Sequence, residues 1–446
     1  MTTADSTVDP IHPTRLEEVN LLDPAVQNCP FHSYEVLRKA APVWHDPRSG
    51  FYFVSRYDLL RELLIDTKRF SNVPPPGQFY VNPERTARIR ALYEEKGWVP
   101  TPSLVLRDDP NHKQLRRPLE KAFRAGRIKE MDPHVAEISY QLIDGFIGEG
   151  KCEWVRQFAV PLPLMVIFRQ VGARTEDMWK VKAWTDAWVR RLGMMQTEEE
   201  ERWSTEMEIE MQHYFQPIFE RLRKEPDATL LSDLVNTVIP EWGRTLTDAE
   251  LHAEMMADIF VGGSETTANS LAAGVKMLIE NPGVWRQLKS DPDKYLRNFV
   301  EEVVRLDGPV QFLLRYAAED TELGGVKIPK DATLLAAYGA ANRDESHFAC
   351  PDKLDLDRSN SGSHLGYGSG IHHCLGAPLA RRELYWGFKA LVDRIEDMWF
   401  EPGRNDFAHM PSLLLRSIKE LHIEFTAKGH GERGAPDGTP NGEHSI

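Results

Sequence analysis

The segment His364-Leu-Gly-Tyr-Gly-Ser-Gly-Ile-His-His-Cys-Leu-Gly-Ala-Pro-Leu-Ala-Arg381 decides how the rest of the chain is interpreted. Glycine stands at the alternate positions 366, 368 and 370 and again at 376, so the backbone can fold tightly against a flat partner. Pro378 is tolerated in the first turn of a helix, and we expect a helix to begin within residues 375–378. Cys374 would then stand where helix N–H groups stabilise a thiolate and lower its pKa. The segment therefore predicts a chemically active cysteine rather than an inert buried thiol.

A zinc site is the alternative interpretation of the same segment, because His372, His373 and Cys374 are all metal-binding residue types. Three adjacent residues cannot all point at one ion, and no matching ligand pair stands nearby. The sequence therefore disfavours zinc.

The composition is that of a folded globular protein. Of 446 residues, 41% are hydrophobic and 27% are charged, which excludes wholesale disorder. The formal net charge of −14 argues against a nucleic-acid partner. Four scattered cysteines do not form a disulfide framework, and no window has the roughly 18 apolar residues of a membrane anchor. We expect a cytoplasmic protein.

Hydrophobic periodicity predicts a mainly α protein with small β-sheets, of the α+β class. Residues 74–106 show no clear period, and we expect a long functional loop there. We expect one catalytic domain over residues 16–427, with a flexible N-terminus over 1–15 and a disordered tail over 428–446. The expected helices are 137–147, 175–192, 199–223, 247–281 and 296–305, and the expected strands are 51–54, pieces of 317–328, and 334–337.

The 364–381 segment resembles the haem-binding loop of the cytochrome P-450 superfamily, in the soluble bacterial form Phe-Gly-x-Gly-x-His-x-Cys-x-Gly. The resemblance extends from about Pro30 to Phe425 and implies that Cys374 is the axial ligand of the iron of haem b. The fold that it implies holds the haem between a long central helix and the helix after the cysteine. Tyr367 replaces the family's phenylalanine, and its effect on the redox potential is open.

The predicted central helix contains Gly262-Gly-Ser-Glu-Thr-Thr267, which resembles the family's oxygen-activation segment. Two mid-helix glycines cost about 1 kcal/mol each relative to alanine, so we expect a local widening or a close ligand approach there. Threonine hydroxyls can bond to backbone carbonyls and hold such a distortion. The resemblance assigns Glu265 and Thr266 to proton delivery during O2 activation.

Other landmarks follow in the family's order. The resemblance implies that Glu302, Arg305 and Arg358 form a buried structural ion network, in which the loss of one member would strand a charge. It implies that the haem propionates are bound by His112, Arg116, Arg315 and His372, and arginine suits planar carboxylates. Gly368 and Gly376 belong to the same cofactor site. The expected substrate pocket contains Asp258, Val261, Gly262, Phe312, Leu313 and Leu413.

Asp258 is the unusual member of this pocket, because an aliphatic residue is common at its position in the family. A carboxylate there must be paired, hydrated or protonated. Two interpretations stay open: Asp258 bonds to a neighbouring helix or an internal water, or it orients a hydroxyl or amine on an otherwise apolar substrate.

The implied function is insertion of one oxygen atom from O2 into a lipophilic small molecule, typically by C–H hydroxylation. Thiolate donation to haem favours O–O cleavage. The sequence contains neither a dinucleotide fingerprint nor an iron–sulfur cysteine set, so electrons must come from a separate ferredoxin system or flavin-type donor. The alternatives are a peroxide-using haem-thiolate enzyme and a haem-based sensor without turnover. A local basic patch is predicted to dock an acidic electron donor, and it contains Lys113, Arg116, Arg117, Lys121, Arg124, Arg127, Lys129, Arg381 and Arg382.

Overall fold

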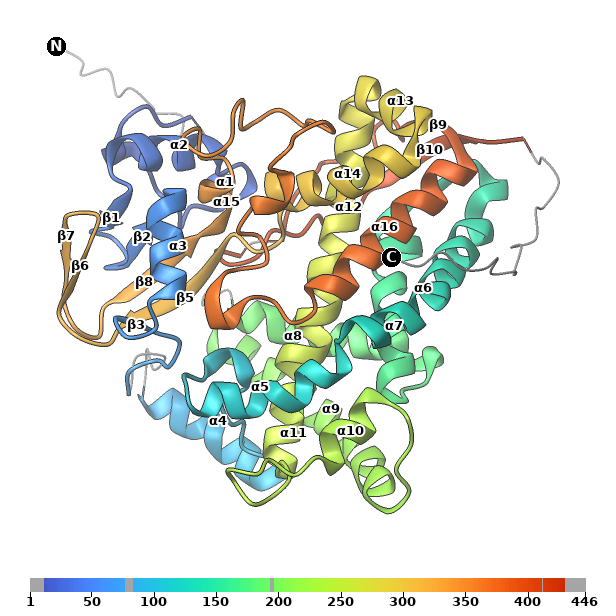
Figure 1. Ribbon diagram of the computed structural model, residues 1–446. Helices are drawn as coiled ribbons and strands as arrows, with labels where there is room; N and C mark the ends of the chain where they lie inside the picture. The colour runs from blue at the N-terminus through green and yellow to red at the C-terminus, as the bar shows by residue number, and fades with distance from the viewer. Residues whose placement is uncertain (1–11, 77–82, 193–195, 411, 430–446) are drawn as a thin grey trace, which may run out of the picture.

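The computed structural model describes residues 12–76, 83–192, 196–410 and 412–429 (Figure 1). The predicted flexible termini lie outside the described residues except for residues 12–15 and 428–429. Helices dominate the described chain, and its sheets are small, so the predicted α+β class is confirmed. Figure 1 shows the largest sheet with α3 on one side of the molecule and the long helices on the other.

Each of the expected helices is present, with boundaries shifted by tertiary contacts and caps. Three consecutive elements, α11, a π-helical segment η6 and α12, form one continuous central helix with helical backbone angles at both junctions. The helices are α1 Pro24–Asn28, α2 Phe31–Ala40, α3 Tyr57–Ile65, α4 Pro83–Lys96, α5 Asn111–Ala122, α6 Ala125–Phe146, α7 Pro161–Val171, α8 Met178–Leu192, α9 Glu198–Lys224, α10 Leu230–Asn236, α11 Asp248–Glu254, η6 Met255–Glu265, α12 Thr266–Glu280, α13 Pro282–Ser290, α14 Pro292–Asp307, α15 Tyr338–Ala341 and α16 Ala377–Arg394.

The strands form a five-stranded sheet, a three-stranded sheet and a two-stranded hairpin within the described residues. In the five-stranded sheet β2 and β8 are parallel, and the other neighbours are antiparallel. The order of the large sheet is β1 Val43–His45, β2 Tyr52–Val54, β8 Thr333–Ala337, β5 Phe312–Ala317 and β3 Phe70–Ser71; the second sheet is β4 Lys151–Glu153, β10 His422–Ala427 and β9 Ile395–Phe400; the hairpin is β6 Thr321–Leu323 and β7 Val326–Ile328.

The central helix and α16 pack closely, and this contact sets the position of the cysteine loop that precedes α16. At Gly274 of α12, an added Cβ would lie 2.3 Å from the Phe388 ring of α16, so only glycine permits this approach. Leu271, Val275 and Phe388 are fully buried in the surrounding core. Close packing of this kind leaves little freedom for the two helices to shift.

The prediction of a continuous loop over residues 74–106 is wrong, because α4 occupies residues 83–96. This helix has one described buried residue, Tyr93, and its contacts to α9 are polar. The Tyr93 hydroxyl donates to Glu208 at 2.8 Å, and Arg88 pairs with Glu198 at 2.8 Å. A helix held mainly by charged and polar contacts has no apolar stripe, so periodicity could not reveal it.

Candidate active site

The cysteine loop has the tight backbone that its glycines predict. Gly368 and Gly370 have φ angles of 73° and 70°, in the left-handed region that favours glycine. At Gly370 a Cβ would also lie 2.8 Å from the Leu64 carbonyl oxygen of α3. The Cys374 N–H donates to the Tyr367 carbonyl at 2.8 Å, and α16 begins at Ala377. The loop thus closes on itself directly before the helix N-terminus.

The Cys374 side chain is solvent-accessible, although protein atoms surround it closely. This partial burial raises the pKa of the Cys374 thiol. The N–H groups of Gly376 and Ala377 and the charges of Arg116 and Arg381 act in the opposite direction. The helix N-terminus therefore favours the thiolate as predicted, although burial outweighs this effect and leaves the pKa of the thiol raised overall. A metal ion deprotonates a coordinating thiol directly, so ligation does not need a lowered pKa.

Basic side chains from three parts of the chain meet beside the loop. His112 of α5 and His372 lie with ring centroids 4.1 Å apart, and the Nε2 atoms of both rings are buried without a hydrogen-bond partner among the described residues. Arg315 of β5 is 4% exposed, and the charges of Arg116 and Arg315 help burial to lower the pKa of His372 to about 3. Buried donors without acceptors fit the two carboxylates of a haem.

Arg116 holds the cysteine loop in addition to adding charge to this cluster. Its guanidinium donates to the carbonyls of Ile371 and His373, at 3.0 and 2.9 Å, and to Glu120 at 2.7 Å. The carbonyl acceptors lie on both sides of His372. The sequence interpretation assigned Arg116 to a propionate and to the basic docking patch, whereas the structure also uses it to connect α5 to the loop.

The central helix is widened at the predicted place, since residues 255–265 are π-helical. The Thr266 hydroxyl donates to the Gly262 carbonyl at 2.9 Å, which is the predicted bond to the backbone. Gly262 and Thr266 are four residues apart on one face, and this face stays accessible while Val261, Ser264 and Glu265 are buried. The accessible face is the part of the central helix that can meet a ligand.

Glu265 points away from solvent and contacts α8. Its carboxylate accepts from the Thr185 hydroxyl at 2.8 Å and pairs with Lys182 at 3.2 Å. Burial disfavours the charged form of Lys182, but the charges of Glu265 and Asp186 outweigh it and raise the Lys182 pKa. Sequence reasoning missed Lys182 and Thr185, because nothing in the α8 sequence indicates a partner some 80 residues away.

Glu302, Arg305 and Arg358 meet in the interior. The Arg305 guanidinium donates to both Glu302 oxygens, at 2.6 and 2.9 Å, and Arg358 Nε lies 3.1 Å from Glu302. The side chains of Glu302 and Arg305 are 0% exposed. The remaining guanidinium N–H groups bond to backbone carbonyls of residues 342–353, in the segment that leads to the cysteine loop.

Known proteins share this arrangement. A model of the cytochrome P-450 family matches residues 187–397. The chain is 31% identical to 6-deoxyerythronolide B hydroxylase of Saccharopolyspora erythraea over 89% of its length and 96% of that protein, and 30% identical to vitamin D(3) 25-hydroxylase of Pseudonocardia autotrophica over 92% and 97%. The chain belongs to the cytochrome P-450 family. Among solved structures, the P-450 haem domain of Tepidiphilus thermophilus matches with a TM-score of 0.83 and 26% identity, over 92% and 96% of the two chains.

As a cytochrome P-450, the protein is a haem-dependent monooxygenase that uses O2, an organic substrate and a redox partner. No helix of the described chain is both long and apolar enough to cross a membrane.

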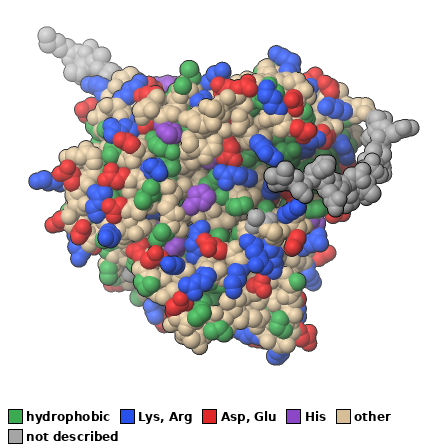
Figure 2. Space-filling view, viewed as in Figure 1, with side chains coloured by type: hydrophobic (Ala, Val, Ile, Leu, Met, Phe, Trp, Pro, Cys, Tyr) green, Lys and Arg blue, Asp and Glu red, His purple; other side chains and the backbone are tan. Residues whose placement is uncertain are grey.

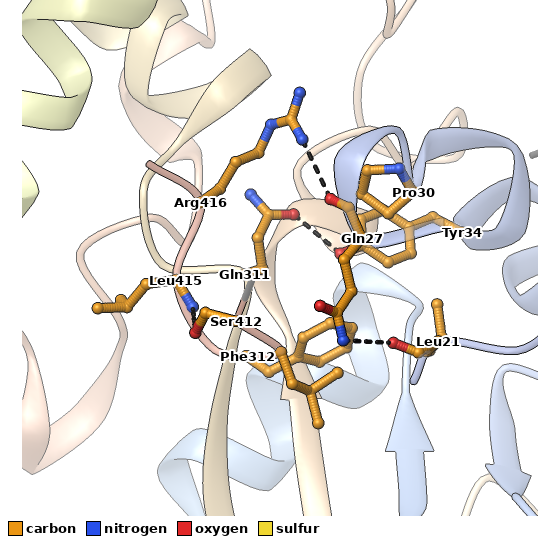
Figure 3. Close-up of a pocket in the computed structure, with 10 residues that line it drawn as sticks. Leu21, Gln27, Pro30, Tyr34, Gln311, Phe312, Ser412, Leu415 and Arg416 are labelled. Carbon is orange, nitrogen blue, oxygen red and sulfur yellow. Dashed lines mark hydrogen bonds between the residues drawn. The ribbon is translucent and has the colours of Figure 1, made fainter. Parts of the chain in front are cut away.

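Two residues expected in the P-450 substrate pocket lie in the hydrophobic core. Phe312 is 2% exposed and packs edge-on against Tyr34 and Phe53, with ring centroids 5.7 and 5.6 Å away. Leu413 is buried in the same cluster. Phe312 and Leu413 border a void of about 10 Å³, close to the size of one water (Figure 3). Their place in the pocket stays a prediction, and strand alternation explains the burial of Phe312, because its neighbour Leu313 points to the other face.

Asp258 does not present a free carboxylate to the pocket. Its Oδ2 accepts the Leu104 N–H at 3.0 Å, in the 3₁₀ turn η2 (Leu104–Leu106) that follows α4. The structure therefore favours the first interpretation of Asp258, a bond to a neighbouring element. Glu254, one turn earlier on the same helix, is 1% exposed. The four-residue spacing of these two acids on one helix was a signal that sequence reasoning missed.

Tyr367, at the family's usual phenylalanine position, carries its phenol into the interior. The hydroxyl is buried without a hydrogen-bond partner among the described residues, and the Arg381 guanidinium lies 4.3 Å from the ring centroid. Arg381 in turn forms two bonds to Glu301, at 2.6 and 3.0 Å. The phenol thus adds a polar group near Cys374 without bonding to it.

Proposed function

We propose that this P-450 uses haem b, ligated by Cys374, to insert one oxygen atom of O2 into a lipophilic small molecule, with electrons from a separate ferredoxin-type or flavin-type donor. The observation that carries the proposal is the accessible Cys374 thiol at the start of α16, beside the buried rings of His112 and His372, whose Nε2 atoms have no hydrogen-bond partner among the described residues. His112, Arg315 and His372 would hold the propionates, and Gly368 and Gly376 would allow the loop to lie against the macrocycle.

A thiolate-ligated haem supplies oxidising power for C–H hydroxylation when it is bound. The chain's own contribution is proton handling on the central helix. Thr266 presents its hydroxyl on the accessible face while it donates to Gly262. Glu265 is held by its ion pair with Lys182 and the bond from Thr185, and it precedes Thr266 in the chain, so its carboxylate can relay a proton toward Thr266.

A lipophilic substrate fits the apolar character of the residues near this face. Val261 belongs to the hydrophobic cluster between α7, α9 and the central helix, and Leu313 is half-buried on β5. Val105 and Leu106 of η2 are both 37% exposed. The two relatives named above are hydroxylases, and their names give 6-deoxyerythronolide B and vitamin D(3) as the molecules that they hydroxylate. We infer an apolar, carbon-rich substrate of similar class.

The decisive experiment is the Soret spectrum of the reduced protein with carbon monoxide. We expect the strongly red-shifted band of a thiolate ligand, and its loss in Cys374→Ala. Cys350→Ala is the matched control, because Cys350 is also exposed but lies outside the loop. A histidine-like spectrum in the native protein would contradict the proposal.

Electron transfer requires a docking surface, and the structure reduces the predicted basic patch. Arg381 is paired with Glu301, Arg382 with Asp132, Arg117 with Glu241 and Arg127 with Asp233. Figure 2 shows acidic groups among the basic ones on this face. The exposed cations left without an ion-pair partner among the described residues are Lys113, Lys121, Arg124 and Lys129.

We infer that these four cations attract an acidic electron donor. Reduction by a ferredoxin should slow as ionic strength rises, because exposed charges are screened within about 10 Å at 0.1 M salt. Lys113→Glu should slow reduction at low salt, whereas Lys330→Glu, at an exposed lysine beyond the β6–β7 hairpin, should not. Equal reduction rates in both variants would contradict a role of these four cations in docking the electron donor.

A further inference from the structure

Two carboxylic acids lie one turn apart inside the central helix. Glu254 ends α11, and Asp258 is in η6, so their side chains share one face. Glu254 is 1% exposed, and neither of its oxygens has a hydrogen-bond partner of good geometry among the described residues. Two ionised carboxylates at this spacing in the interior would repel each other strongly. The geometry therefore favours a proton on one of them.

The segment that faces this acid pair is the start of η2. Asp258 accepts the Leu104 N–H at 3.0 Å, and the Val105 N–H also lies close enough to stabilise its charge. Leu104 is 7% exposed. The acid pair thus holds two consecutive residues of a connecting segment against the central helix.

The far side of η2 is attached to the large sheet. The Asn72 amide donates to the Val105 carbonyl at 2.9 Å, and the Asn72 N–H donates to Asp108 at 2.9 Å. Asn72 follows β3 directly. The η2 segment therefore connects the sheet and the central helix, and its exposed Val105 and Leu106 side chains lie within one turn of the bond to Asp258.

Few other charges reach the pair. Arg107 follows η2, and its guanidinium lies 4.0 Å from Glu250, which is paired with Arg244 at 2.6 Å. His252, also on α11, contacts Trp98, Gln216 and Phe219 instead. Burial and the charge of Asp258 raise the pKa of Glu254 well above its usual value, and Arg107 opposes this only in part. Glu254 is thus the residue that holds the proton.

We propose that Glu254 and Asp258 are positioning residues for the monooxygenase reaction: with one of the two acids protonated, they hold the backbone of Leu104 and Val105 against the central helix and so fix one apolar wall of the substrate site. This inference rests on the proposed function for its consequence, because the wall matters only if a substrate binds there. Its structural part, a proton-dependent attachment of η2, stands independently.

Loss of the proton from Glu254 should release the start of η2 from the central helix. When Glu254 ionises at high pH, repulsion between the two carboxylates weakens the hold on the N–H groups of Leu104 and Val105. Glu254→Gln keeps the shape and neutrality of the protonated acid, so in this variant the attachment of η2 to the central helix should not depend on pH. Asp258→Ala removes the hydrogen-bond acceptor, so the attachment should be lost at every pH.

The direct measurement is amide hydrogen exchange at Leu104 and Val105 in the haem-loaded protein, corrected for intrinsic pH dependence. A hydrogen bond to a charged group contributes about 1.5–3 kcal/mol, so Asp258→Ala should accelerate exchange by about tenfold or more. The native protein should lose protection between pH 7 and 9.5, and Glu254→Gln should not. Glu95→Gln, at an exposed glutamate of α4, is the matched control and should behave as the native protein.

A second measurement tests whether η2 forms an apolar wall of the substrate site. Titration with 4-phenylimidazole, a lipophilic ligand of ferric haem, should give a dissociation constant that rises at least threefold from pH 7.5 to 9.5 in the native protein and stays constant in Glu254→Gln. Unchanged exchange at Leu104 in Asp258→Ala would overturn the proposal, as would an equal pH response in Glu254→Gln. A histidine-like carbon monoxide spectrum would instead overturn the proposed function while leaving the exchange result intact.

Discussion

The Glu302 network and the Glu254–Asp258 pair both place carboxylates in the interior, but they neutralise them in different ways. Glu302 has two arginines, and the spare guanidinium N–H groups meet backbone carbonyls. Glu254 faces another acid and must keep a proton. The first arrangement is insensitive to pH over the physiological range, because arginine stays charged. The second depends on pH. Equal burial therefore does not imply an equal role.

The largest change in the free energy of unfolding is expected when the network of Glu302, Arg305 and Arg358 is broken. Arg305→Ala should lower the free energy of unfolding by about 3–5 kcal/mol, because Glu302 would be left as a buried uncompensated charge. Arg305→Lys should recover only part of this, since lysine cannot form the bidentate contact. Urea unfolding at pH 6 and pH 8 should give the same loss. A loss that depends strongly on pH within this interval would contradict the distinction between the Glu302 network and the Glu254–Asp258 pair.

For the acid pair, removal of the titrating group is expected to raise the free energy of unfolding rather than to lower it. Glu254 has a raised pKa in the folded state, so the unfolded chain releases its proton first, and stability falls as pH rises above about 4.5, the usual glutamate value. Glu254→Gln removes this loss and should stabilise the protein by about 1–3 kcal/mol at pH 8, with little effect at pH 4.5. Thermal unfolding over this pH interval is the measurement. Destabilisation at pH 8 would show that Glu254 is not the protonated member.

An intermediate effect is expected at Lys182, whose side chain is 17% exposed. Lys182→Met removes the cation beside Glu265, leaves the Thr185 bond, and should cost about 1–2 kcal/mol. Because Lys182 is the cation paired with the Glu265 carboxylate, the pH profile of substrate turnover should differ from that of the native protein. A profile identical to that of the native protein would remove Lys182 from the proton-handling group.

The smallest change in the free energy of unfolding is expected at an exposed ion pair. Arg202 and Glu206 form a helix surface pair at 3.3 Å, with side chains 67% and 41% exposed. Arg202→Ala should change the free energy of unfolding by at most about 0.5 kcal/mol, and salt should reduce this further. Urea unfolding at two ionic strengths is the measurement. A larger change would mean that burial does not explain the order of these effects.

Local patterns predicted the parts of the site whose geometry is itself local. The glycines of the cysteine loop, the start of α16 and the bond from Thr266 to Gly262 depend on residues within four positions of one another. The helix α4 and the core position of Phe312 could not be predicted in this way. The first is held by charges on α9, and the second by the packing of Tyr34 and Phe53.

The sequence by itself determined the class of chemistry, because glycine backbone preferences, helix starts and the order of the motifs are properties of the chain. Only the tertiary structure decided how each buried charge is balanced. Lys182 meets Glu265, Leu104 meets Asp258, and Arg116 meets the cysteine loop across separations of 83, 154 and 255 or more residues. A pKa depends on the dielectric and the charges within a few ångströms, and those neighbours are brought together by the fold.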